Sequence, residues 1–171
     1  MAFKLVAAFF LVAIFGANAL SFQNCDSEAP IQIGSVSVKS PVTIRPGARI
    51  PVRARYSNRY EANRDTVFRL HSIKVERNLF WNAYVNIPIE EYIPIKTFRC
   101  IDLEALSPIP LCPGELGNQQ FEGSFTIPSS LNLPGIAQTF GSGKYRVAAD
   151  IRDETGQRVV CIKKAIVQVK L

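Results

Sequence analysis

Four cysteines and one histidine are the residues of this 171-residue chain that most readily bind metals or act as nucleophiles. They are Cys25, Cys100, Cys112, Cys161 and His71. A structural zinc site normally uses closely spaced cysteine pairs, often with histidine. The spacings here are wide, and the thioredoxin-type C-x-x-C motif does not occur. We therefore interpret the cysteines as disulfides, for which four cysteines allow three pairings.

Catalysis has little support in the sequence. A nucleophile–histidine pair would have to use His71, which we interpret as a solvent-facing strand residue on the same face as Arg69. The G-x-S-x-G motif and glycine-rich phosphate-binding loops are absent. We expect no catalytic residues, no metal and no cofactor, and therefore a binding protein rather than an enzyme. Two carboxylates brought together only by folding, as in glycosidases, are the open alternative.

The first residues predict a secretory signal peptide. Lys4 precedes the apolar run Leu5–Phe15, and the small residues of Gly16–Ala19 provide an A-x-A cleavage site. The apolar run is shorter than the ~20 residues that a membrane-spanning helix needs. We expect residues 1–19 to be removed and residues 20–171 to form one domain. That domain would be secreted or lysosomal, and an oxidising secretory compartment would let its disulfides form.

Apolar and polar residues alternate through most of the remaining chain, which is typical of half-buried strands. The clearest examples are residues 50–56, IPVRARY, and residues 145–151, YRVAADI. The phase shifts between Leu70 and Ile73, which indicates a β-bulge. No long amphipathic helix is evident, so the predicted class is all-β, an immunoglobulin-like sandwich or barrel of about seven or eight strands. Further strands are expected at Ile31–Val38, Val67–Val75, Ala83–Ile87, Phe121–Ile127 and Val159–Val169.

Positive charge is concentrated in one part of the chain. The net charge is +6, and the segment Arg45–Arg77 holds nine basic residues against three acidic ones. This charge favours anionic partners. The segment is either a solvated outer face or a site for anionic head groups. Nucleic acid is not expected, because aromatic residues are not interleaved with the basic ones.

Two apolar stretches lie outside the alternating segments, Leu79–Trp81 and Leu131–Phe140. Loops normally run over the surface and are polar, so these stretches are either plugs of the core or loops that contact a membrane. Trp81 suits a membrane interface because its ring is apolar and its N–H is polar. The candidate membrane-contacting residues are Leu79, Phe80, Trp81, Leu133, Ile136 and Phe140.

Five segments, in their order and spacing, resemble the ML lipid-recognition family. Within that family they are most similar to the lysosomal sphingolipid activators that serve β-hexosaminidase in ganglioside catabolism. The resemblance implies an immunoglobulin-like β-cup with a lipid cavity between its sheets. It also implies the disulfides Cys25–Cys161 and Cys100–Cys112. The segments are FQNCD, WNAYVNIP, FRCIDL, LCPGELGNQQFEGSFTIPSSLNLP and GKYRVAADIRDETGQRVVCIKKAIVQVKL.

The resemblance further implies a lipid-binding and transfer protein. Such a protein would extract a glycolipid from a membrane and present it to a β-hexosaminidase-like glycosidase. A sterol or phospholipid carrier and an innate-immune lipid sensor are the alternatives within the family. An immunoglobulin-like adhesion or receptor-binding module with a filled core is the alternative of another class. The residues expected to line the cavity are Phe68, Leu70, Val85, Ile87, Tyr145, Val147 and Ile151.

Overall fold

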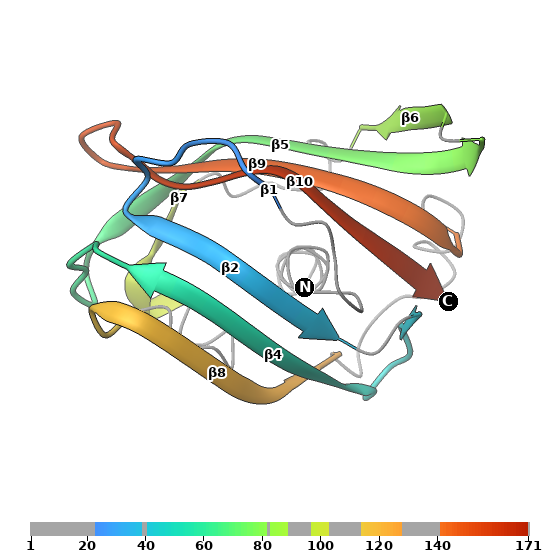
Figure 1. Ribbon diagram of the computed structural model, residues 1–171, viewed down its shortest axis with the longest axis horizontal. Coiled ribbons are helices and arrows are strands. Elements are labelled where there is room, and N and C mark those ends of the chain that lie inside the picture. The colour runs from blue at the N-terminus through green and yellow to red at the C-terminus, as the bar shows by residue number, and fades with distance from the viewer. Residues whose placement is uncertain are drawn as a thin grey trace.

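The computed structural model describes residues 23–38, 41–81, 83–88, 97–102, 114–127 and 141–170. Within these ranges ten strands form two sheets that face each other (Figure 1). Apart from the helical residues 100–102, the regular structure described is β-strand, which confirms the predicted all-β class. The predicted signal peptide, residues 1–19, lies outside the described residues.

The larger sheet has the strand order β1-β10-β9-β5-β6, with β3 beside β10 and β7 beside β5. Neighbouring strands within this sheet are antiparallel, except that β3 runs parallel to β10. The strands are β1 (Gln23–Asn24), β3 (Val42–Thr43), β5 (Val67–Phe80), β6 (Ala83–Ile87), β7 (Thr97–Arg99), β9 (Gly143–Asp153) and β10 (Arg158–Lys170).

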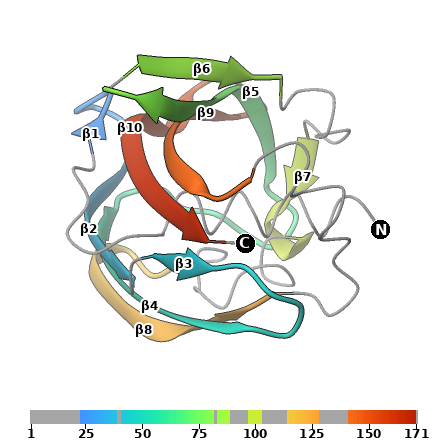
Figure 2. The same cartoon turned by 90° about the vertical axis from the view of Figure 1, so that its right-hand side faces the viewer.

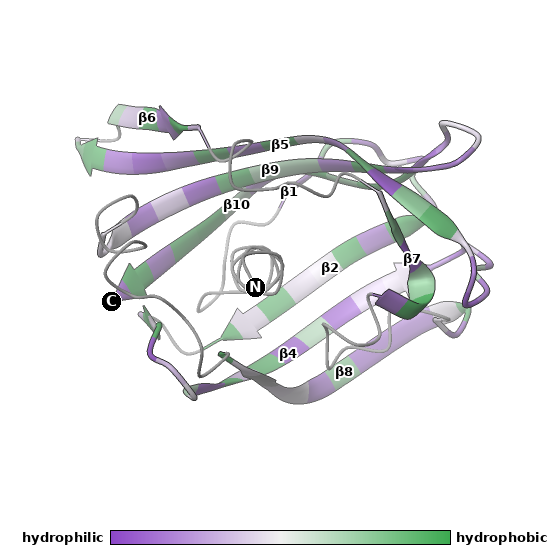
Figure 3. Cartoon of the chain, turned by 180° about the vertical axis from the view of Figure 1, so that it is seen from behind, coloured by the Kyte–Doolittle hydropathy of each residue, from purple (hydrophilic) through white to green (hydrophobic). Residues whose placement is uncertain are grey.

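The smaller sheet contains β2 (Ile31–Val38), β4 (Arg49–Asn58) and β8 (Gly117–Thr126), in the order β2-β4-β8. Strand β4 shows why the sequence forms a two-layered structure. Ile50, Val52 and Ala54 are buried, whereas Arg53 and Arg55 are exposed, because successive side chains of a strand point to opposite faces. Figure 3 shows this alternation of hydrophobic and hydrophilic residues along the strands.

The predicted bulge is present in β5. The pairing of β5 with β9 shifts register between Leu70 and Ser72. Because of this shift His71 and Ser72 are both exposed, while Ile73 is buried on the same face as Phe68. The interpretation of His71 as a solvent-facing residue is therefore confirmed. The bulge keeps one face of this long strand apolar on both sides of the shift.

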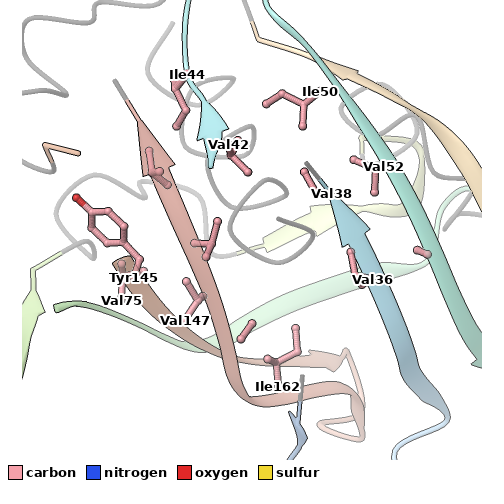
Figure 4. Packing of buried hydrophobic residues seen from close by; sticks show 14 of the residues in the cluster. Val36, Val38, Val42, Ile44, Ile50, Val52, Val75, Tyr145, Val147 and Ile162 are labelled. Carbon is pink, nitrogen blue, oxygen red and sulfur yellow. The ribbon is translucent and has the colours of Figure 1, made fainter. Parts of the chain in front are cut away.

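The main hydrophobic core lies between the two sheets. Figure 4 shows side chains of the smaller sheet pointing toward those of the larger sheet. A second, smaller cluster is formed by Phe68, Cys100 and Val159. The residues drawn and labelled in Figure 4 are Val36, Val38, Val42, Ile44, Ile50, Val52, Val75, Tyr145, Val147 and Ile162.

The two sheets are not parallel along their length. They lie close together at the end where β5 begins, and they diverge toward the end that carries the β5–β6 hairpin (Figure 1). Seen from that end, the strands form two curved layers that face each other (Figure 2). The fold therefore has a narrower end and a wider end, and the β5–β6 hairpin lies at the wider one.

A tight hairpin turn at residues 153–157 connects β9 to β10. The Gly156 N–H donates to the Asp153 carbonyl at 3.1 Å, and the Asp153 N–H donates to the Gln157 carbonyl at 2.9 Å. Gly156 has φ of +87°, a conformation that residues with a Cβ adopt only at a cost. The Asp153 side chain also accepts from the N–H groups of Thr155 and Gln157.

Candidate functional site

Most of the residues expected to line a cavity lie on the inward faces of the sheets. Tyr145, Val147 and Ile87 belong to the main core, and Leu70 packs against it. Phe68 is buried in the second cluster, where Ile151 packs against it. Val85 differs, since it is 49% exposed. It pairs with Arg77, beyond the last buried pair of β5 and β6, Val75 and Ile87.

The tip of the β5–β6 hairpin is an exposed apolar surface. Leu79, Phe80 and Trp81 are 55%, 66% and 95% exposed. The prediction that they form a loop is wrong, because Leu79 and Phe80 are the last residues of β5 and Trp81 starts the turn. The polar residues before them do not end the strand, since cross-strand pairing with β6 continues to Phe80. Trp81 is not a plug of the core.

Trp81 also has an unfavourable backbone conformation. Its φ is +49°, and it is the non-glycine residue with positive φ among those described. A large side chain in this left-handed region is uncommon and costs free energy, because its Cβ crowds the backbone. Trp81 therefore combines a strained backbone with a bulky apolar side chain that is almost fully exposed. Neither feature stabilises the fold. This combination makes Trp81 a candidate functional residue.

Arg77 lies on the inward-facing row at the base of this tip. On β5 it follows buried Val75 by two residues, and its cross-strand neighbours are Val85 and Tyr145. Its Nη2 donates to the Ser142 carbonyl at 3.0 Å. A Cβ built on Gly141 would lie 3.1 Å from the same Nη2, so glycine at this position leaves room for the guanidinium.

Tyr145 holds the start of β9 beside Arg77. Its hydroxyl donates to the Gly141 carbonyl at 2.7 Å. Burial raises the pKa of Tyr145, and the nearby positive charge of Arg77 opposes this shift. Sequence reasoning counted Arg77 only as one of many basic residues. The signal for its position was the period-two spacing Ile73, Val75, Arg77, which places an arginine in the apolar phase.

The outward-facing side of the hairpin carries a compact ionic group. Glu76 accepts from Arg146 Nε and forms a salt bridge with Lys74 Nζ at 2.9 Å. The hydrogen bond from Arg146 lowers the pKa of Glu76 most, against the effect of burial. The Arg146 guanidinium also lies 4.3 Å from the ring centroid of Tyr84, a cation–π contact. The group has two positive charges and one negative charge, and its contacts join β5, β6 and β9.

The other candidate residues of the apolar stretches, Leu133, Ile136 and Phe140, lie outside the described residues. The basic residues Arg53 and Arg55 point outward from the smaller sheet, which fits the interpretation of a solvated face. Arg53 forms a salt bridge with Glu122 at 2.7 Å.

The disulfide Cys25–Cys161 is present, as the resemblance implied. Its Cα atoms are 5.3 Å apart, and the Cys25 N–H donates to the Cys161 carbonyl at 3.1 Å. Cys100 is fully buried and also disulfide-bonded. Its predicted partner, Cys112, lies outside the described residues, so that pairing stays a prediction.

The described residues contain neither a membrane-spanning helix nor a metal-binding cluster. No helix in the described ranges is long and apolar enough to cross a membrane. Among the same residues, no group of three or more histidine, cysteine, aspartate or glutamate side chains is arranged to hold a metal ion.

The protein is a β-sandwich of two sheets with an apolar interior. It carries an exposed apolar hairpin at its wider end. The family is shown by its sequence: the model of the ML domain, the family described as E1_DerP2_DerF2, matches residues 19–167. The chain therefore belongs to the ML family of lipid-recognition domains. A comparison with curated protein sequences gave no match.

Two solved structures resemble the chain over most of its length. One is a Niemann-Pick type C2 protein from Japanese carpenter ant, with 14% identity, a TM-score of 0.40, and coverage of 87% of this chain and 98% of that one. The other is chicken MD-1 complexed with lipid IVa, with 14% identity, a TM-score of 0.41, and coverage of 91% and 94%. Because both TM-scores are low, the family match is the basis of the assignment.

Proposed function

We propose that this protein binds a lipid between its two sheets and transfers it to and from membranes. The β5–β6 hairpin tip, formed by Leu79, Phe80 and Trp81, would contact the bilayer. The observation that carries the proposal is this exposed apolar tip at the wider end of a sandwich whose facing surfaces are apolar. Family membership supports the same function.

The energetics favour such a role. Each methylene removed from water contributes ~0.8 kcal/mol, so an apolar interior can compensate for lifting a two-chain lipid out of a bilayer. The proposed cavity residues are Phe68, Leu70, Ile87, Tyr145, Val147 and Ile151, with Val85 nearer the surface. No bond needs to break in this process, so we propose a carrier and not an enzyme.

The test is the lipid content of the purified protein. Protein expressed in eukaryotic cells and purified without detergent should carry lipid at near-stoichiometric amounts, detected by mass spectrometry. Recovery of sterol or phospholipid alone would favour the carrier alternatives. Protein that carries no lipid, and that moves none between vesicles, would refute lipid binding and favour an adhesion or receptor-binding module.

We further propose that the cargo is a glycolipid and that the protein activates a β-hexosaminidase-like glycosidase. The support is the resemblance of the segment Gly143–Leu171 to sphingolipid activators; most of this segment forms β9 and β10, which are joined by a glycine-containing hairpin. The proposed location is the secretory route or the lysosome, on the strength of the predicted signal peptide. Hydrolysis of a vesicle-bound ganglioside by a β-hexosaminidase should rise when the protein is added. An unchanged rate, with lipid transfer intact, would remove the activator role alone.

A further inference from the structure

We propose that Arg77 binds the acidic head group of the cargo lipid and so makes this protein selective for anionic lipids. The inference rests on the proposed lipid-binding function and adds the class of cargo and the residue that selects it. The head group would present a phosphate, carboxylate or sulfate, each of which accepts charge-assisted hydrogen bonds from a guanidinium.

The position of Arg77 is the first argument. It occupies the inward-facing phase of β5, two residues after Val75, which is only 1% exposed. Its neighbours in that row are Val85, which is half-exposed, and Tyr145, which is buried. The guanidinium therefore lies where the apolar interior ends and the exposed hairpin begins. A lipid with its acyl chains between the sheets would place its head group at this boundary.

The second argument is charge. Among the described residues, Arg146 and Lys74 form salt bridges with Glu76, Arg53 with Glu122, and Arg158 with Asp26 and Asp150. Within the same ranges no carboxylate forms a salt bridge with Arg77, whose contact is the Ser142 carbonyl. A guanidinium has five N–H donors, so this single bond leaves donors for an anion.

The third argument is that the guanidinium is held in place. Besides the bond to the Ser142 carbonyl, its Nη1, Nη2 and Cζ atoms lie 3.1–3.3 Å from where a Gly141 Cβ would be. Tyr145 fixes the same backbone through its bond to the Gly141 carbonyl. A donor that is already oriented loses less conformational entropy on binding than a freely rotating side chain, which favours specific binding.

The test measures which lipid the protein takes when head group is the only variable. Wild-type protein is incubated with vesicles of equimolar phosphatidylglycerol and phosphatidylcholine that have identical acyl chains. It is then separated from the vesicles, and the ratio of the two bound lipids is measured by mass spectrometry. This ratio does not depend on how much protein is folded. We expect wild type to be enriched in phosphatidylglycerol.

Three variants make the test specific. In R77Q the ratio of bound phosphatidylglycerol to phosphatidylcholine should fall roughly tenfold, the effect of removing one charge-assisted hydrogen-bonding group. R77K keeps the positive charge and should keep most of the preference. R55Q removes the same charge from an exposed position on the outer face of the smaller sheet and should match wild type.

Each other outcome has a defined meaning. Wild type that carries neither lipid would overturn the role of Arg77, whereas the proposed function is decided separately by the lipid content of the protein purified from eukaryotic cells. Wild type that carries lipid without preference, or R77Q that keeps the wild-type ratio, would overturn the role of Arg77 alone. So would R77K behaving as R77Q does. In a parallel arm, weaker sedimentation of R77Q with anionic vesicles at an unchanged ratio would mean that Arg77 contacts the membrane surface and not the cargo.

Discussion

Arg158 links three parts of the chain through two carboxylates. Its Nη1 donates to Asp26 and its Nη2 donates to Asp150, each at 3.1 Å. Arg152 adds a third bond of 3.1 Å to Asp150. Burial by itself would raise the pKa of Asp150, but the hydrogen bonds from Arg158 and Arg152 outweigh burial and lower it. The ionised form of Asp150 is therefore favoured by folding.

This shift predicts how stability changes in acid. A carboxyl whose pKa is lowered by folding contributes stability above its unfolded value of 3.8, and that contribution disappears as pH falls through the native value. The free energy of unfolding should be nearly constant from neutral pH to about pH 5 and should decrease below about pH 4. Urea titrations at several pH values, followed by circular dichroism, measure this.

The contribution of Asp150 itself can be separated. Asp150→Asn should lose roughly 1.5–3 kcal/mol at neutral pH, because hydrogen bonds to a charged group are weakened. It should also flatten the decrease in acid. Glu61→Gln is the control, since Glu61 is exposed. An acid profile for Asp150→Asn that parallels wild type would show that other carboxyls cause the transition.

Trp81 provides the other prediction at the residue scale. Trp81→Gly should weaken association with vesicles several-fold, because the exposed ring is lost. The same variant should be as stable as wild type or up to about 1 kcal/mol more stable, because glycine adopts positive φ without a Cβ clash.

The control for Trp81 is Leu116→Ser. Leu116 is 51% exposed and directly precedes β8, a strand of the smaller sheet, whereas the hairpin tip belongs to the larger sheet. Its replacement should leave vesicle association unchanged. Sedimentation with vesicles and thermal unfolding are the measurements. If Trp81→Gly unfolds at a much lower temperature, or sediments as wild type does, the hairpin tip is not a membrane contact.

At the scale of the element, the bulge in β5 accommodates one extra residue and keeps the apolar residues before and after it on the inward face. Without the extra residue at the bulge, the apolar phases before and after it would already coincide. Deletion of His71 would place Leu70 opposite Ile151 and Ile73 opposite Ala149 in an uninterrupted ladder with β9. Deletion of Lys74, which lies beyond the bulge, would instead move Val75 from the core to solvent.

These two deletions therefore have different expected costs. Deletion of His71 should preserve the fold, since every buried residue of β5 stays on the inward face. Deletion of Lys74 should lose at least about 2–5 kcal/mol, the usual cost of removing a large aliphatic residue from a core. Urea denaturation of both variants tests this. Equal destabilisation by both deletions would mean that the bulge is required for the curvature of β5.

At the scale of the whole molecule, the disulfide joins Cys25, the residue that follows β1, to Cys161 in β10. The two cysteines are 136 residues apart in the sequence. Closing so long a loop restricts the unfolded chain. Replacing both cysteines by serine should lower the free energy of unfolding by about 3–5 kcal/mol. Thermal unfolding of the double variant measures the loss.

The pairing itself can be checked chemically. Peptide mapping without reduction should recover Cys25 joined to Cys161 and Cys100 joined to Cys112. A peptide linking Cys100 to any other residue would contradict the second pairing. Because Cys100 is buried beside Phe68 and Val159, its bond also anchors the second hydrophobic cluster.

Local pattern determined much of this fold. Strand periodicity located seven of the strands, and the phase shift at Leu70 located the bulge, because alternation in a strand depends only on neighbouring residues. The glycine turn at Gly156 was predictable for the same reason. The short strands β1, β3 and β7 were not, since segments of two or three residues carry no periodicity of their own.

The candidate site divides in the same way. The sequence by itself marked the apolar stretch Leu79–Trp81 and the inward residues Tyr145 and Val147. Only the tertiary structure decided that Leu79 and Phe80 extend β5, that Trp81 is exposed, and that Val85 lies outside the core. It also brought Arg77 against Gly141 and Ser142. Burial and contact depend on which strands become neighbours, and residues distant in sequence meet only once both sheets have formed.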